Sequence, residues 1–138
     1  MPTTVLVFGT FDLFHPGHEF FLREAKKHGD ILQVVVARDK TVEEVKGKKP
    51  ADDEIRRLSK LQSLGFVDDV ILGSLGDKYK IIEALKPDII VLGYDQKAFT
   101  ENLEEELKKR GLKTEVIRLK ESFKPETYKS SKIRIMIE

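Results

Sequence analysis

Short apolar runs rich in β-branched residues alternate along the chain with longer stretches in which apolar residues recur every three or four positions. The runs predict strands at Thr4–Phe8, Ile31–Ala37, Val67–Leu72, Asp88–Leu92 and Lys113–Leu119. Several of these runs are apolar almost throughout, which is typical of a parallel sheet buried on both faces. The longer stretches predict helices at Pro16–His28, Asp52–Leu64 and Lys78–Leu85, a helix capped by Thr100 that ends at Arg110, and a last short helix from Ser130 through Met136.

This alternation of strands and helices predicts an α/β, Rossmann-like fold. Its centre would be a five-stranded parallel sheet with helices on both faces and right-handed crossovers. The chain has 138 residues and no internal repeat, so we expect residues 1–138 to form a single domain. Ligands of such sheets bind beyond the carboxyl ends of the strands, where the strand order reverses. Candidate functional residues should therefore directly follow the strands.

The charge balance and the lack of cysteine exclude several classes of protein. Lys and Arg number 25 against 24 Asp and Glu, which disfavours a protein whose main partner is nucleic acid. Without cysteine there is no disulfide framework, thiolate metal site or cysteine nucleophile. No apolar run of about 18 residues predicts a membrane span. The first residues lack a signal-peptide pattern, so we expect a cytoplasmic protein. A charged fraction of 36% and a single asparagine favour a thermophilic source.

Two of the three histidines follow the first predicted strand, in the segment Gly9–His18. Pro16 suits the first position of a helix, which would place His15 at the helix start and His18 in the first turn. Their three-residue spacing puts both on one face. Gly17 leaves room for a ligand beside the free N–H groups of the helix, which favour anions. The arrangement predicts a phosphate site, although cap and core histidines are the structural alternative.

Polar residues also follow two other predicted strands. Asp39 comes after the second strand, where an acid binds a ribose hydroxyl in dinucleotide-binding folds. The chain has no G-x-G-x-x-G motif after the first strand, which disfavours a dinucleotide-dependent dehydrogenase. Gly93, Tyr94 and Asp95 follow the fourth strand, where a ring could stack on the tyrosine. A turn leading into a helix is the simpler interpretation of that segment.

The segment GTFDLFHPGH at residues 9–18 resembles the signature of the cytidylyltransferase-like nucleotidyltransferases, which are of the HUP type. The resemblance extends through Ala37–Thr41, Lys46–Pro50, Glu54–Arg56, Val67–Asp69, Pro87–Gln96 and Ser130–Ile133. Within this family the chain is similar to the small glycerol-3-phosphate cytidylyltransferases and, more closely, to archaeal FAD synthases.

The resemblance implies a transfer reaction without a covalent enzyme intermediate. A phosphate acceptor attacks the α-phosphorus of a nucleoside triphosphate, and pyrophosphate leaves. The expected substrates are ATP and FMN, with Mg²⁺ or another divalent cation accompanying ATP, and the expected assembly is a homodimer. Two alternatives stay open: a CTP:glycerol-3-phosphate or sugar-phosphate nucleotidyltransferase, and a regulatory module that binds nucleotide without turnover.

The resemblance also assigns roles to individual residues. It implies catalytic roles for His15, His18, Thr10 and Lys46, and no metal ligands. It implies nucleotide contacts for Gly9, Thr10, Phe11, His15, Gly17, His18, Gly93, Tyr94, Asp95, Ser130 and Ser131, and acceptor contacts for Asp12, Asp39, Lys46 and Arg56. Lys46 and Lys48 lie in what reads as a solvated loop. The family often has a second arginine further along the helix of Arg56. This chain lacks it, which argues against a glycerol-3-phosphate site.

Overall fold

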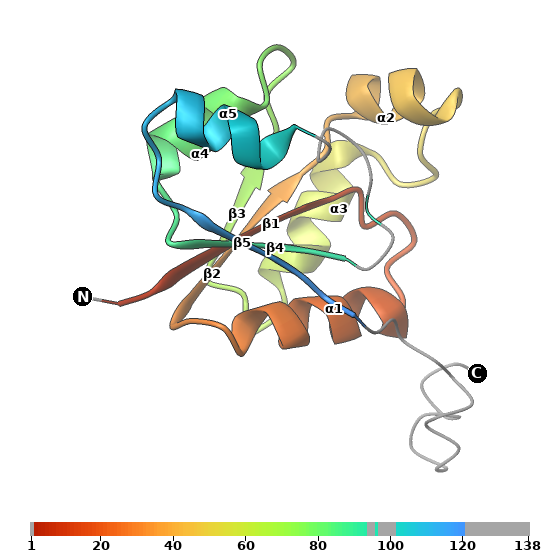
Figure 1. The fold of residues 1–138 in the computed structure, drawn as a ribbon. Helices are drawn as coiled ribbons and strands as arrows, with labels where there is room; N and C mark the ends of the chain where they lie inside the picture. The colour runs from red at the N-terminus through yellow and green to blue at the C-terminus, as the bar shows by residue number, and fades with distance from the viewer. Residues whose placement is uncertain (1, 94–95, 97–101, 121–138) are drawn as a thin grey trace.

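A five-stranded parallel sheet forms the centre of the computed structural model, which describes residues 2–93, 96 and 102–120 (Figure 1). Its strands are β1 (Thr4–Gly9), β2 (Ile31–Val36), β3 (Asp69–Leu72), β4 (Ile89–Leu92) and β5 (Glu115–Arg118). They are arranged in the order β3-β2-β1-β4-β5. The predicted parallel sheet is therefore confirmed. The chain moves outward from β1 to β3 and then returns to the other side of β1, so the strand order reverses between β1 and β4.

The helices lie on both faces of the sheet, as predicted. They are α1 (Pro16–Lys26), α2 (Asp39–Lys46), α3 (Glu54–Gln62), α4 (Tyr79–Leu85) and α5 (Leu103–Lys109). One apolar core includes Leu22 of α1 and Leu61 of α3, and the other includes Ile82 of α4 and Leu107 of α5. Figure 1 accordingly shows α1 on one side of the sheet and α4 and α5 on the other. None of the helices in the described ranges is long and apolar enough to cross a membrane.

Four points about the helices differ from the predictions or lie outside the described residues. Helix α2 was not predicted, because it buries only Val42 and so shows no apolar stripe. Helix α5 begins after Asn102, whereas the predicted cap Thr100 lies outside the described residues, as does the predicted last helix. In α3, Ile55, Leu58, Leu61 and Leu64 recur at every third position, a spacing that predicts one apolar stripe, yet Ile55 is 57% exposed.

The correction in α3 has a geometric cause. A residue every third position drifts by about 60° around the helix at each step, so a long i+3 series leaves the buried face. The position four residues before Leu61 is Arg57, and this is the side chain that α3 buries, with 1% exposed. The buried face of α3 therefore presents a guanidinium to the carboxyl ends of the strands.

Candidate active site

The loop after β1 is held in an unusual conformation by a buried aromatic ring. Phe11 and Leu13 both have positive φ angles, 54° and 48°, a region that bulky residues rarely adopt. Phe11 is only 6% exposed. A Cβ at Gly9 would lie 2.6 Å from two atoms of the Phe11 ring, so the ring packs here only because position 9 is glycine. Phe11 was predicted to bind nucleotide; in the structure its buried ring packs against Gly9 and supports the loop from below.

His15 and His18 cap the start of α1 in a reciprocal arrangement. The Nδ1 atom of His15 accepts a hydrogen bond from the backbone N–H of Gly17 at 3.0 Å. The Nδ1 atom of His18 accepts one from the backbone N–H of His15 at 3.3 Å. A neutral imidazole that accepts through Nδ1 carries its proton on Nε2. Both rings therefore keep an Nε2–H donor for another partner.

His18 is neutral because its surroundings disfavour the charged form. Its ring stacks on that of His15 with centroids 3.8 Å apart and lies 5.5 Å from Phe11 and 5.4 Å from Phe14. Burial lowers the pKa of His18 to about 4, assisted by the charges of His15 and Lys46, while Asp12 acts in the opposite direction. The influence of Lys46 also shows that the structure brings this predicted residue near the histidines.

Arg57 joins the ends of β1 and β2 to the helices that follow them. Its guanidinium donates to the carbonyl oxygens of Thr10, Ala37 and Asp52 at 2.9, 2.8 and 3.0 Å. A fourth hydrogen bond, of 2.7 Å, reaches the carboxylate of Asp39. A buried charge with this many partners fixes the relative positions of the groups around it. Sequence reasoning favoured its neighbour Arg56, which is exposed on α3.

The two predicted acceptor-binding aspartates hold the same region together. The carboxylate of Asp12 accepts hydrogen bonds from the backbone N–H groups of Ala51 and Asp52, both at 2.8 Å. Desolvation acts to raise the pKa of Asp12, but these hydrogen bonds and the charge of Arg57 hold it below its usual value. Asp39 begins α2 and pairs with Arg57. In the free protein both carboxylates are therefore engaged in internal contacts.

The sequence predicted that Lys46 lies in a loop, whereas in the structure it is the last residue of α2. The helix ends at Gly47, whose φ of 79° is the left-handed conformation that glycine adopts readily. Lys46 and Lys48 are both exposed. Of the two, only Lys46 lowers the pKa of His18. This electrostatic effect indicates that Lys46 is the lysine nearer to His18.

The remaining predicted residues divide between described and undescribed parts of the chain. Gly93 directly follows β4, on the carboxyl side of the sheet where the loop after β1 begins. Tyr94, Asp95, Ser130 and Ser131 lie outside the described residues. Among residues 2–93, 96 and 102–120, no group of three or more His, Cys, Asp or Glu side chains could hold a metal ion.

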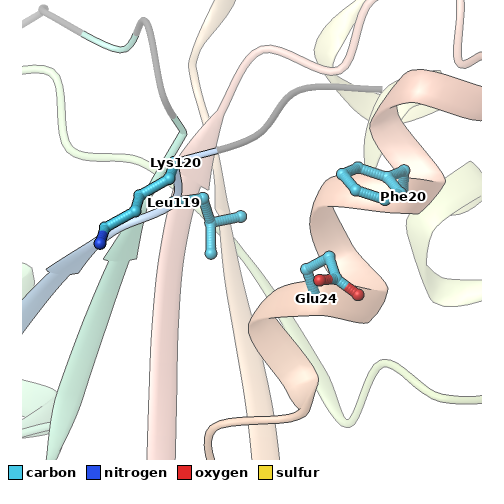
Figure 2. Close-up of a pocket in the computed structure, with 4 residues that line it drawn as sticks. All are labelled: Phe20, Glu24, Leu119 and Lys120. Carbon is cyan, nitrogen blue, oxygen red and sulfur yellow. The ribbon is translucent and has the colours of Figure 1, made fainter. Parts of the chain in front are cut away.

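A hollow of about 200 Å³ lies between α1 and the end of β5. Figure 2 shows Phe20 and Glu24 on α1 across from Leu119, with the side chain of Lys120 turned away from the helix. None of the predicted site residues lines this hollow, so the candidate site stays at the loop after β1.

Known proteins share both the sequence and this architecture. A family model described as cytidylyltransferase-like matches residues 6–135. The chain belongs to the cytidylyltransferase-like family. It is 54% identical over 116 residues to an FAD synthase of Aciduliprofundum boonei, covering 84% of this chain and 77% of that relative. It is 49% identical over 129 residues to an FAD synthase of Ferroglobus placidus, covering 94% and 84%.

A solved structure carries the same fold at high similarity. It is described as the lipopolysaccharide core biosynthesis protein from Thermoplasma volcanium, and it is 42% identical to this chain with a TM-score of 0.84. The match covers 90% of this chain and all of the other. This cytidylyltransferase-like protein is thus a nucleotidyltransferase, and the arrangement at the start of α1 is its candidate active site.

Proposed function

We propose that this chain is an FAD synthase, which transfers the adenylyl group of ATP to the phosphate of FMN and releases pyrophosphate. Relatives about half identical over most of the chain bear that name. The structural observation that carries the proposal is the reciprocal cap of His15 and His18. It leaves two Nε2–H donors at the start of α1, where the positive end of the helix dipole favours the anionic oxygens of a triphosphate.

In the proposed mechanism both histidines donate hydrogen bonds through Nε2, and His18 does so in its neutral form. An oxygen of the FMN phosphate attacks the α-phosphorus of ATP, and the bond to the β-phosphate oxygen breaks. Negative charge then grows on the departing pyrophosphate. Donors that are already oriented stabilise this charge without further reorganisation. His18 needs no proton transfer for this role, in agreement with its lowered pKa.

Lys46 and Thr10 complete the proposed phosphate site. The positive charge of Lys46 would neutralise phosphate oxygens of ATP or of FMN as the two substrates approach. Thr10 would contact the reacting phosphates, and its backbone is fixed because its carbonyl oxygen accepts a hydrogen bond from Arg57. Holding two anionic substrates in line is a large part of catalysis in phosphoryl transfer.

Mg²⁺ would enter with ATP as part of the substrate complex. Mg²⁺ prefers oxygen ligands and in such sites is held largely by phosphates and water. The histidines offer nitrogen, and the carboxylate of Asp12 is occupied by backbone N–H groups. The described residues therefore suit a metal that the triphosphate carries, whose chemistry is to neutralise charge on the phosphates.

A sugar phosphate is the second candidate acceptor, since the Thermoplasma structure is described as a lipopolysaccharide core biosynthesis protein. Pyrophosphate release should be measured with ATP and with CTP, each combined with FMN, glycerol 3-phosphate or heptose 1-phosphate. FMN with ATP should exceed every other pair. Greater release with heptose 1-phosphate or glycerol 3-phosphate would reject the flavin acceptor.

We further propose that the enzyme is a cytoplasmic homodimer from a thermophile. Light scattering of the purified protein should give twice the chain mass of 15.8 kDa. A monomer mass at micromolar concentration would reject the dimer and leave the chemistry unaffected.

A further inference from the structure

The pairing of β1 with β4 stops well before the carboxyl ends of these strands. Within the described residues it joins Val5 to Ile89 and Leu6 to Ile90. By contrast, β1 pairs with β2 as far as Gly9 and Val36. The two backbones are therefore not held together by the sheet where the strand order reverses, which is the place where α/β sheets take ligands. We refer to this unpaired stretch, Val7–Gly9 opposite Val91–Gly93, as the split.

The side-chain amide of Gln96 spans the split. Its Nε2 donates to the carbonyl oxygen of Phe8 at 3.1 Å, and its Oε1 accepts from the backbone N–H of Gly93 at 3.1 Å. One amide thus joins the end of β1 to the end of β4. The opposite orientation of the amide would place two donors or two acceptors together at each end, so both partners define this one.

Arg118, the last residue of β5, binds both Gly93 and Gln96. Its guanidinium donates to the carbonyl oxygens of Gly93 and Gln96 at 2.9 and 2.8 Å. The backbone N–H of Gln96 also donates to the carbonyl oxygen of Gly93 at 3.2 Å. Gln96 is therefore fixed at its backbone as well as its side chain. None of these bonds involves His15, His18 or Lys46.

We propose that Gln96 and Arg118 are positioning residues for the nucleotide, because together they set the spacing of Gly9 and Gly93 across the split. The inference rests on the proposed function in one respect: the ligand at the split is the nucleoside triphosphate. A change in this spacing alters how well the two backbones fit the nucleotide. It leaves the His15–His18 cap and the Asp39–Arg57 ion pair in place.

Gln96→Glu tests the amide with a side chain of the same shape. It keeps an acceptor for Gly93 and loses the donor to Phe8. The Kd for a non-hydrolysable ATP analogue, measured by calorimetry, should rise about tenfold. The KM for FMN and kcat should change by less than about twofold. Gln62→Glu, at the exposed end of α3, is the matched control and should bind the analogue like the unmodified chain.

Arg118 provides an independent arm of the same test. Arg118→Ala should weaken analogue binding to about the same extent as Gln96→Glu, and Arg118→Lys should recover part of the loss because it keeps a donor on a long side chain. The double variant should lose less than the product of the single losses, since both residues bind the backbone of Gly93. If Gln96→Glu does not fold, the graded Arg118 pair carries the test. Arg23→Ala, on the exposed side of α1, serves as control.

Two results would overturn the inference: analogue binding unchanged in both single variants, or equal losses for ATP and FMN together with a lower melting temperature. The second result would show that the hydrogen bonds of Gln96 and Arg118 stabilise the fold and do not position the nucleotide. Because calorimetry with the ATP analogue needs no acceptor, the test is separate from that of the FAD synthase proposal. A chain that binds the analogue but makes no FAD would count against the proposed function alone.

Discussion

His18 is the residue in which local structure and chemistry are most closely connected. Burial and the charges of His15 and Lys46 lower its pKa to about 4. In the free protein its ring should therefore show no titration by NMR between about pH 5.5 and 8, whereas an ordinary histidine titrates near 6.5. A midpoint near 6.5 for His18 would contradict the neutral-donor mechanism.

Acidification should also destabilise the fold through His18. Its pKa is lower in the folded than in the unfolded chain, so the unfolded chain binds the extra proton first. The contribution to the free energy of unfolding is complete above about pH 6.5 and decreases as the pH falls toward 4. His18→Asn should flatten this part of the pH–stability curve in urea titrations. An unchanged curve would show that His18 does not contribute to it.

Removing the His18 side chain should affect turnover more than folding. We expect His18→Ala to lower kcat by at least about 100-fold, because one lost transition-state donor costs on the order of 3 kcal/mol. Circular dichroism should show the helices and the sheet intact. Turnover close to that of the unmodified chain would remove His18 from the mechanism.

Arg57 should matter for stability in a way that its neighbour Arg56 does not. Arg57→Met would leave three carbonyl oxygens and the Asp39 carboxylate without their donor, at a cost of about 3 kcal/mol in the free energy of unfolding. Arg56→Met, at an exposed position, should change it by less than about 0.5 kcal/mol. Equal effects of the two substitutions in urea unfolding would show that the buried contacts are not stabilising.

Single residues were predictable where spacing alone indicates a function. The two histidines and Pro16 are enough to locate the candidate phosphate site from the sequence, because a proline starts a helix and a three-residue step shares a face. Arg57 and Gln96 were missed, since their partners are backbone groups far away in the sequence. The apolar pattern of a sequence predicts which apolar side chains are buried. It gives no signal for a buried charged side chain such as Arg57.

Among the elements, α2 ends with Lys46, whose positive charge acts on His18. Replacing Lys46 with Gln should raise the pKa of His18, because the charge of Lys46 lowers it. NMR titration of His18 in Lys46→Gln and in the control Lys40→Gln, exposed on the same helix, separates the two positions. An unchanged pKa in Lys46→Gln would place Lys46 too far away to assist the phosphates.

The elements were predicted well where they are apolar and poorly where they are polar. All five strands were found, because buried parallel strands are continuous apolar runs. Helix α2 was missed because a residue of another helix caps its first turn. The carboxylate of Glu54 in α3 accepts a hydrogen bond from the backbone N–H of Asp39 at 2.9 Å. Its end relies on Gly47. Neither feature has a periodic signature.

For the whole molecule, strand order explains why residues from distant parts of the sequence form one site. Both the loop after β1 and Gly93 lie at the carboxyl edge, on either side of the reversal between β1 and β4. The parallel sheet with right-handed crossovers was predictable from the alternation of elements. The early end of the β1–β4 pairing was not, because register depends on contacts between strands and leaves no trace in either strand alone.

The central claim is that this nucleotidyltransferase makes FAD, and one measurement tests it most directly. Purified protein, ATP, Mg²⁺ and FMN should be incubated, and the products separated by chromatography and identified by mass. We predict FAD and pyrophosphate in equal amounts, with formation reduced at least about 100-fold in His18→Ala. No FAD from ATP and FMN, with pyrophosphate released from CTP and glycerol 3-phosphate instead, would contradict the account.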